Sequence, residues 1–500
     1  MIRNQRQSAV VSAVYIAWGI CSALILALIF FFSGDVYACK RDFVNLFVLL
    51  FVGLALVLCI YFLFTICMKK LRSDRGPVIV GVVFMVFQIW LMKYFSFHTG
   101  WDVQGIIMSA WQAARGEVID AYTFSVYPNN ILLTYIFSRI LRLGLKLGLA
   151  EYHAYDLLLI GQSFLNFLTG LLTYYVLCRM TKSKNLAFAG YAVFLLLVGL
   201  SPWVSIPYSD ASGLFFPTAI LALYLKTVQK RGWIIAKWTA IGFLAWFGYQ
   251  IKPTVFIVLI ALVIMEFFSA CRQRKLLPFG AHILLVAIGI MLSSFTVSFA
   301  VRDFGYWVNP EKTFGPAHFL AMGLNEDSMG IWAAEDVNYS EAVLTAKERT
   351  QADLDLAKQR VKKMGVSGLL QQFKRKLLTN FNDGTFAWAQ EGNFFRVIPE
   401  SSNEKLASLI RSFYYEDGEH YHLFLNFEHA VWLAVLFLSA FSCLTEQKTE
   451  VSVIMLTLLG FVVYGLLFEA RARYTYLFSP FFIILSVLGM QCLDRRKRDV

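Results

Sequence analysis

The sequence predicts an all-α protein that crosses a membrane many times. Hydrophobic residues make up 58% of the 500 positions, and the mean hydropathy is +0.60. Runs of about 20 apolar residues recur along the chain, and a run of that length crosses the hydrocarbon core of a bilayer as a helix. A helix is the expected form because it satisfies its own backbone hydrogen bonds. The 46 Phe and 12 Trp suit lipid-facing and interfacial positions.

The positive charge of the chain gathers in short clusters between the apolar runs. The net charge is +12, and the clusters mark one side of the membrane, as the positive-inside rule describes. This distribution argues against a nucleic-acid-binding face. It predicts a multi-pass protein of the cell membrane with both termini cytoplasmic. The inner clusters are Arg3 with Arg6, Lys69 to Arg75, Arg179 to Lys184, Lys226 to Arg231, Arg272 to Lys275, and Arg495 to Arg498.

About twelve spans follow from the apolar runs and the alternation of the basic clusters. They are expected at about 11–33, 44–68, 78–96, 154–178, 185–200, 212–226, 234–250, 254–270, 281–300, 428–445, 451–469 and 474–493.

One more apolar run, about 129–148, is expected to lie at the outer surface as a re-entrant or interfacial helix. If both this run and 154–178 crossed the membrane, the basic cluster that begins at Arg179 would fall outside. The alternative is a kinked 154–178 run with both ends outside. The sequence favours the interfacial helix because Tyr127-Pro128-Asn129-Asn130 opens the run, and because Arg139, Arg142 and Lys146 interrupt its far half.

Three parts are expected along the chain. Residues 1–301 form an N-terminal transmembrane module, whose first outer loop, 97–153, carries the candidate catalytic acid. Residues 302–425 form a small extracellular domain, because this polar stretch is too long for a simple connection. It contains one amphipathic helix at about 341–378. Residues 426–500 form the C-terminal transmembrane helices.

The candidate catalytic residue is Asp102, in the stretch Phe97-His98-Thr99-Gly100-Trp101-Asp102. It lies where a long apolar run ends on the predicted outer side. A carboxylate at the mouth of a helix bundle is well placed to accept a proton from an incoming hydroxyl. The alternative is a solvated acid at a helix end.

Other charged residues on the predicted outer side form a second group of candidates. Asp210 is a second acid that could position a divalent ion or orient an acceptor, or could cap the helix that starts at Ala211. Lys252 lies beside a proline at the end of an apolar span, where it could bind a phosphate or snorkel. Two arginines, Arg471 and Arg473, run against the positive-inside bias and suit a lipid phosphate; the alternative for them is a salt bridge with Glu469.

Aromatic, amide and imidazole side chains near these charges are candidates for binding substrate. Aromatic rings stack on sugar faces, while amides and imidazoles form hydrogen bonds with hydroxyls, although the same residues also build ordinary small domains. No spacing of ligand residues resembles a metal site. No cofactor is required by the sequence, and a divalent cation, Mg²⁺ or Mn²⁺, is left open. The substrate-binding candidates are Trp101, Tyr127, Asn129, His318 and Tyr474.

The order of these features resembles the GT-C membrane glycosyltransferases. The resemblance is to the protein O-mannosyltransferase and aminoarabinose transferase branch, and in detail to Gram-positive bacterial members with Tyr-Pro-Asn-Asn, Lys-Pro-Thr and Met-Gly-Leu-Asn elements. It covers about 78–490. The early Pro-Pro-Leu pair of many mannosyltransferases is replaced by Tyr-Pro-Asn-Asn, so the donor sugar stays open. The segments that carry the resemblance are Asp102, Tyr127 to Asn130, Pro207-Tyr208-Ser209-Asp210, and Glu469-Ala470-Arg471-Ala472-Arg473-Tyr474.

The resemblance implies transfer of a sugar, with inversion, from a polyprenyl-phosphate donor on the outer face. Asp102 would be the general base, and Arg471, Arg473 and Lys252 would hold the lipid phosphate. The acceptor would be a cell-envelope glycan such as a cell-wall polysaccharide, a teichoic acid, another glycolipid or a protein, with residues 302–425 helping to choose it. The bilayer is a partner, and nucleic acid is not.

Other functions fit a polytopic chain of this kind. A transporter or flippase of lipid-linked sugars would need ionisable groups near mid-span and paired broken helices. An outer-face glycan polymerase or ligase would share the substrates and transfer a whole glycan. A membrane scaffold would carry no chemistry. The acids of this chain crowd the outer ends of the spans, which favours the glycosyltransferase.

Overall fold

The computed structural model describes residues 9–33, 44–63, 75–119 and 122–498. Over these residues the chain is α-helical, and extended backbone pairs at one isolated bridge, between His98 and Val397. The prediction of an all-α fold is confirmed. The predicted inner basic residues Arg3, Arg6, Lys69, Lys70 and Arg72 and the end of the second predicted span, 64–68, lie outside the described residues, as do the side chains of 495–498.

Within the described residues, eight segments are long and apolar enough to cross a membrane. They are Ala9–Phe32 (α1), Gly76–Phe95 (α3), Glu151–Thr181 (α7), Pro253–Gln273 (containing α12, Phe256–Gln273), Leu276–Phe304 (α13), Tyr421–Leu444 (containing α18, Tyr421–Ala440), Thr449–Leu467 (α19) and Arg473–Asp494 (within α20, Arg473–Arg498). Three shorter apolar segments match further predicted spans: Leu46–Phe62 (α2), Lys184–Gly199 (containing α8, Lys184–Phe194) and Ser209–Leu225 (α9, Ser209–Gly213, and α10, Phe215–Leu225).

The remaining predicted span is α11, Arg231–Ile251, which packs backbone to backbone against α13. Glycines make this contact possible. A Cβ atom on Gly242 would lie 2.1 Å from the carbonyl oxygen of Val286, and one on Gly289 would lie 2.0 Å from that of Thr239. Small residues allow such close approach between helices in a membrane. The close packing of α11 against α13 therefore depends on Gly242 and Gly289.

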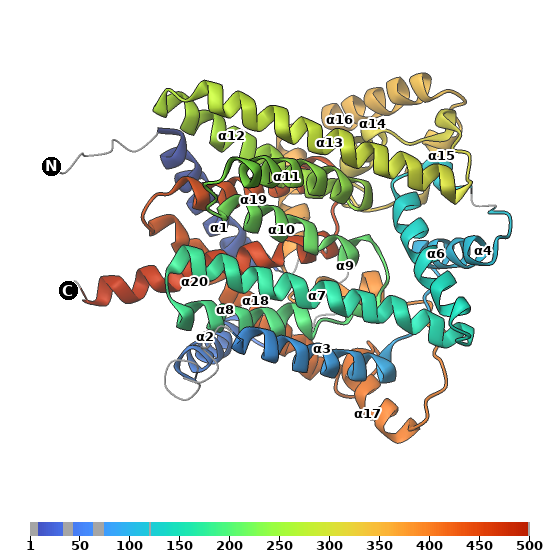
Figure 1. Ribbon diagram of the computed structural model, residues 1–500, viewed down its shortest axis with the longest axis horizontal. Helices are drawn as coiled ribbons and strands as arrows, with labels where there is room; N and C mark the ends of the chain where they lie inside the picture. The colour runs from blue at the N-terminus through green and yellow to red at the C-terminus, as the bar shows by residue number, and fades with distance from the viewer. Residues whose placement is uncertain (1–8, 34–43, 64–74, 120–121, 499–500) are drawn as a thin grey trace.

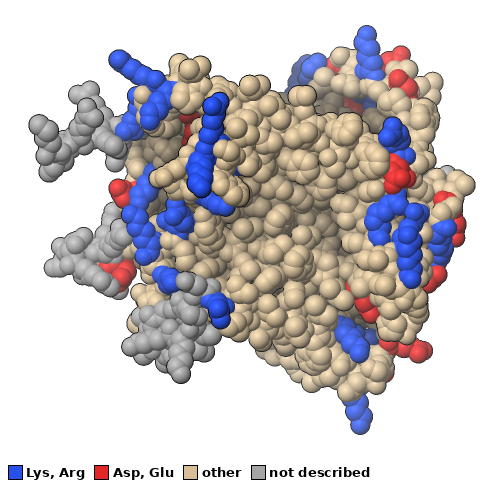
Figure 2. Space-filling view, in the orientation of Figure 1, with Lys and Arg blue, Asp and Glu red and all other residues tan. Residues whose placement is uncertain are grey.

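The two ends of the bundle differ. Both chain termini lie at one end, and the shorter helices gather at the other (Figure 1). Charged side chains are concentrated at the two ends, with a broad uncharged band between them, as a membrane-spanning bundle requires (Figure 2). Acidic and basic residues mix at the end opposite the termini. The shorter helices there are α4 (Asp102–Arg115), α5 (Thr123–Val126), α6 (Asn130–Lys146), α14 (Pro316–Gly323), α15 (Ala334–Glu341) and α17 (Glu404–Tyr414), and the long, kinked α16 (Ala346–Phe381) lies beside them.

The predicted interfacial helix is α6, which packs on α4, α7 and α13 at the end opposite the termini (Figure 1). Its arginines find partners there. Arg139 pairs with Asp303 near the end of α13, and the Nε of Arg142 donates to the carbonyl of Ala114 at 3.1 Å. These contacts explain how basic residues interrupt an otherwise apolar helix.

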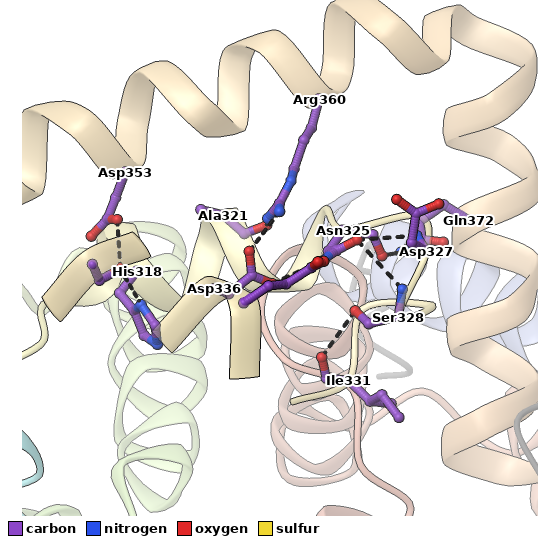
Figure 3. Close-up of polar contacts among 12 residues, drawn as sticks. His318, Ala321, Asn325, Asp327, Ser328, Ile331, Asp336, Asp353, Arg360 and Gln372 are labelled. Atoms are coloured by element: carbon purple, nitrogen blue, oxygen red, sulfur yellow. Dashed lines mark hydrogen bonds and ion pairs between the residues drawn. The ribbon is translucent and has the colours of Figure 1, made fainter. Parts of the chain in front are cut away.

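Helix α16 corresponds to the predicted amphipathic helix 341–378. Thr345 caps its first turn by accepting from the backbone N–H of Glu348, and the two side chains bond to each other. The helix kinks at Gly365, whose φ of 59° lies in the left-handed region. Its first half holds α14 and α15 through buried polar contacts, in which Arg360 pairs with Asp336 (Figure 3).

Candidate functional site

A cluster of buried ion pairs lies at the end of the bundle opposite the termini, and Asp210 is its centre. Asp210 is the second residue of α9, not its N-cap, and is 1% exposed. The Nζ of Lys252 lies 2.6 Å from Asp210 Oδ1, and the Nε of Arg473 lies 3.5 Å from Oδ2. Lys252 is extended because it precedes Pro253, which starts a new turn after α11 ends at Ile251.

The second carboxylate of the cluster is Glu391, which is 2% exposed. Its Oε2 lies 3.7 Å from the Nε of Arg473, and its Oε1 lies 4.0 Å from an Nη of Arg471. Arg473 therefore bridges two acids that stand 181 positions apart in the sequence, Asp210 and Glu391. Burial raises the pKa of Glu391, and the charges of Arg471 and Arg473 oppose this rise.

The third carboxylate is Glu469, in the turn between α19 and α20. The Nε of Arg471 lies 3.0 Å from its Oε1, and the hydroxyl of Tyr474 donates to its Oε2 at 2.7 Å. Burial acts to raise the pKa of Glu469, but the charge of Arg471 and the bond from Tyr474 outweigh it, so the pKa lies below the usual value. The Nζ of Lys252 lies 3.8 Å from the centre of the Tyr474 ring, which joins this group to Asp210.

Asp102 lies at the exposed edge of the cluster, in the first turn of α4. Tyr208 donates a hydrogen bond to Asp102 Oδ2 at 3.2 Å. The guanidinium of Arg473 lies over the rings of both Tyr208 and Trp101, at 5.3 Å and 4.7 Å. Asp102 and Asp210 are thus connected through Tyr208 and Arg473. A helix N-terminus favours a carboxylate, which explains the place of Asp102 within α4.

Several buried polar atoms of the cluster have no hydrogen-bond partner. These include the indole Nε1 of Trp101, the Nε of Arg473, Oδ2 of Asp210 and both carboxylate oxygens of Glu391, which contact cations only as longer ion pairs. Buried polar atoms in proteins are usually satisfied, so such a concentration calls for water or a ligand. Buried charges at the end of membrane helices are costly and mark candidate functional sites.

The turn that carries Glu469, Arg471 and Arg473 is held by Lys376 of α16. The Nζ of Lys376 donates to the carbonyls of Leu466 and Phe468, which end α19, and to that of Gly323. Burial lowers the pKa of this amine to about 7. Helices α14 and α16 thereby fix the position of the turn that carries Glu469, Arg471 and Arg473.

Three of the substrate-binding candidates lie outside the ion pairs. Tyr127 packs against Phe314, and Asn129 contacts its neighbour Asn130. His318 is 1% exposed and lies inside the polar core of α14–α16 (Figure 3). Its Nδ1 bonds to Ser340 Oγ at 2.7 Å.

The environment of His318 is that of a structural residue. Ser340 uses its only hydroxyl proton on Asp353, so His318 must donate to Ser340. Burial lowers the pKa of His318 to about 4. The imidazole is therefore neutral at pH 7 and helps to hold α14 on α16.

Two members of the cluster, Tyr208 and Glu391, carry only a weak signal in the sequence. Tyr208 lies in the Pro-Tyr-Ser-Asp loop, two residues before the candidate Asp210. A tyrosine so close to a candidate acid was the signal that could have indicated its place in the site. Glu391 reaches the cluster through a strained segment in which Phe386 and Ala387 both have positive φ, of 56° and 55°. Because that path depends on tertiary structure, local sequence carried no comparable signal for Glu391.

The residues of the cluster do not fit a divalent cation. Within the described residues, no group of three or more His, Cys, Asp or Glu side chains could hold a metal ion. Both oxygens of Asp210 already face a cation, Lys252 on one side and Arg473 on the other. A metal ion there would meet like charges, so no step in the chemistry below is assigned to one.

Comparisons with known proteins agree with the membrane architecture. A family model described as "Conserved hypothetical integral membrane protein" matches residues 5–492, and the chain belongs to this family. The prediction of a polytopic membrane protein is therefore confirmed. Among solved structures, the chain is similar to the crystal structure of ArnT from Cupriavidus metallidurans bound to undecaprenyl phosphate, with 15% identity over 85% of this chain and 79% of that chain, and a TM-score of 0.31. A similarity at this score says nothing about the substrate of this chain. No match was found among the curated proteins.

Proposed function

We propose that this member of the family is a GT-C-type glycosyltransferase that moves a sugar from a polyprenyl-phosphate donor to a cell-envelope acceptor. The reaction class comes from the motif resemblance. The observation that supports it is the convergence of Asp102, Asp210, Lys252, Arg471 and Arg473, which lie up to 371 positions apart, in one ion-pair cluster. By the positive-inside rule the cluster faces the outside of the cell and the termini face the cytoplasm.

In this proposal Asp102 is the general base. Asp102 is exposed, so an acceptor hydroxyl can reach it. The other three acids of the cluster pair with cations, whereas Asp102 has no ion pair within the described residues and its carboxylate is available to accept a proton. Removal of the hydroxyl proton by Asp102 would let the oxygen attack the anomeric carbon from the face opposite the phosphate, with inversion. The new glycosidic bond forms as the sugar–phosphate bond breaks, and the electron pair leaves with the prenyl phosphate.

The phosphate would be bound by Arg471, Arg473 and Lys252. Arg471 is the most accessible of the three, with a side chain 16% exposed against 9% and 10% for the others. Preorganised cations stabilise the charge that develops on a leaving phosphate. The unpaired indole N–H of Trp101 offers one more donor beside Arg473. Each cation also has a carboxylate partner, so a phosphate would share rather than replace these contacts.

The prenyl chain has an apolar groove available nearby. The groove has a volume of 370 Å³ and lies between α3, α17 and α18, where it is lined by Leu91, Phe413 and Phe427 among others. One of its lining residues, Tyr414, accepts through its backbone carbonyl from the indole of Trp388, which lies in the same turn as Glu391.

The test is complementation of a strain that lacks the protein, with surface glycans measured by mass spectrometry. Asp102→Asn keeps the size of the side chain and cannot act as a base. The matched control is Asp156→Asn, an exposed acid near the start of α7 at the same end of the bundle. We expect one sugar to disappear from the envelope with Asp102→Asn, at normal protein level, and to persist with the control. An unchanged glycan profile in both variants would remove Asp102 from catalysis.

A further inference from the structure

A second candidate site lies at the opposite end of the bundle, beside the chain termini. It is a cavity of 880 Å³ between the C-terminal ends of α7, α10 and α20, the first turns of α11 and α19, and Glu266 of α12. The wall at α20 includes Leu488 and Gln491, which lie 15 and 18 residues beyond Arg473. At 1.5 Å per residue, the cavity is roughly 25 Å along α20 from the ion-pair cluster. It is therefore a separate site.

The charged groups of this cavity leave an excess of cations. Five lysines and arginines and three glutamates line it. Glu266 accepts from the hydroxyl of Tyr224 at 2.7 Å, and Glu446 pairs with Lys448 at 3.0 Å. The Nζ of Lys237 is engaged by the backbone carbonyls of Tyr224 and Lys226 at the end of α10.

The remaining charged groups are the cations Arg179, Lys182 and Lys226 and the carboxylate of Glu450, all exposed at the cavity, so the cations are in excess by two. Arg179 donates to Thr227 Oγ1 at 2.6 Å, which uses one of its five N–H groups. The buried residues of the same wall include the apolar Trp238, Val451 and Leu488 and the polar Thr181. Accessible cations at the mouth of a cavity fit an anionic group such as a phosphate.

Lys182 is held in an unusual conformation. It follows the last residue of α7 with a φ of 56°, in the left-handed region that favours glycine. A lysine in this conformation is less favourable than glycine, because its Cβ crowds the backbone. A cation at a helix C-terminus offsets part of this through the helix dipole. The same geometry recurs at Arg274, the C-cap of α12 at the same end of the bundle, outside the cavity lining.

We propose that this cavity binds a phosphate group through Arg179, Lys182 and Lys226. The phosphate can belong to an anionic phospholipid of the inner leaflet or to soluble phosphate, since both present the same oxygens to these cations. The site is independent of the proposed glycosyl transfer, so either can fail without the other.

The test measures the thermal stability of the full-length protein, purified in a neutral detergent, against two probes. The first is phosphatidylglycerol in mixed micelles, with phosphatidylcholine as its neutral reference, and the second is inorganic phosphate at constant ionic strength. A ligand that binds only the folded protein raises the melting temperature, and the rise grows with the logarithm of the ratio of its concentration to its Kd. Stabilisation by phosphatidylglycerol alone identifies the lipid as the source, and stabilisation by both probes identifies the phosphate itself.

The variants Lys182→Gly and Arg274→Gly form a matched pair. Each removes one cation and relieves the same backbone strain, so both are expected to melt at or above the wild-type temperature without ligand. We expect Lys182→Gly to need about tenfold more probe for half of the stabilisation, and Arg274→Gly to match wild type, since one charge-assisted bond is lost only in the first. Arg179→Gln is a second variant, with the same tenfold loss expected and the backbone unchanged. Equal effects of both glycine variants, or no response of wild type to either probe, would overturn the proposal.

Discussion

The ion-pair cluster predicts a large and specific loss of stability for Asp210→Asn. Asp210 is the carboxylate between Lys252 and Arg473, whose side chains are 10% and 9% exposed. Asparagine has nearly the same size but no charge, so the substitution leaves two buried cations facing each other. Removing one partner of a buried ion pair typically destabilises a protein by about 3–5 kcal/mol. Because two cations lose the same partner, we expect the upper part of that range.

A double-mutant cycle isolates the pair. Lys252→Met alone should destabilise less than Asp210→Asn, because Arg473 remains to neutralise Asp210. In the double variant, loss of the second cation should recover part of the effect of Asp210→Asn, giving a coupling of about 1–3 kcal/mol. The measurement is thermal unfolding of purified protein in detergent at pH 7.

The control for this cycle is Asp355→Asn. It breaks an exposed ion pair of 3.0 Å with Lys358, and exposed pairs contribute little. The melting temperature should stay that of wild type. An Asp210→Asn variant with the melting temperature of wild type would contradict this prediction. So would a double variant whose destabilisation equals the sum of the two single effects.

Two other predictions concern the contacts by which α14 and α16 hold the turn that carries Glu469, Arg471 and Arg473. The pKa of Lys376 is about 7 in the folded protein and about 10.5 in the unfolded chain. Between these two pH values the unfolded chain binds more protons at this amine than the folded protein does. The contribution of Lys376 to the free energy of unfolding therefore rises by about 2 kcal/mol from pH 7 to 9. Lys376→Met should remove this rise, which is measured as the difference between the two proteins' melting temperatures at pH 7 and 9; parallel shifts would contradict it. Gly323→Ala should destabilise, because its Cβ would lie 2.5 Å from the carbonyl oxygens of Leu467 and Phe468, whereas Gly315→Ala, with no contact closer than 4.0 Å, should melt as wild type. Equal melting temperatures for the two alanine variants would show that the turn is not clamped at Gly323.

The membrane helices were predictable because their signal is local. Length and apolarity of a run decide whether it can cross a bilayer, and both are read directly from the sequence. Helix α4 was not predicted, although its signal was present. Its buried residues Val103, Ile106, Ile107, Ala110 and Ala114 repeat at helical spacing, and Gly116 ends it with a φ of 79°. The aromatic residues around it masked this pattern.

The candidate site was predictable only in part, for a physical reason. Sidedness and unusual charge placement singled out Asp102, Asp210, Lys252, Arg471 and Arg473 as separate candidates. Which of them pair depends on the packing of α9, α11 and α20, and this is set by many weak contacts over the whole chain. Local sequence therefore indicates five members of the cluster and one pairing, that of Arg471 with Glu469, but not the role of Glu391 or the pairing of Asp210 with Lys252 and Arg473.

The charge balance of the cluster sets the terms on which it can hold a phosphate. Asp210, Glu391 and Glu469 oppose Lys252, Arg471 and Arg473, so the six charges cancel when all are ionised. Burial raises the pKa of Glu391, whereas that of Glu469 is lowered. Of these two acids, Glu391 is the one that takes up a proton more readily when an anion arrives.

A proton on Glu391 would leave three cations facing two carboxylates, with the excess charge beside the accessible Arg471. Phosphate binding at the cluster should therefore be accompanied by proton uptake, and it should weaken as the pH rises. Titration calorimetry with a short-chain polyprenyl phosphate, in two buffers of different ionisation enthalpy, counts the protons taken up. Glu391→Gln, which is neutral at every pH, should bind without that proton. Binding of the probe to wild type with no proton taken up would contradict this coupling and would mean that the cations reach the phosphate without any change at Glu391.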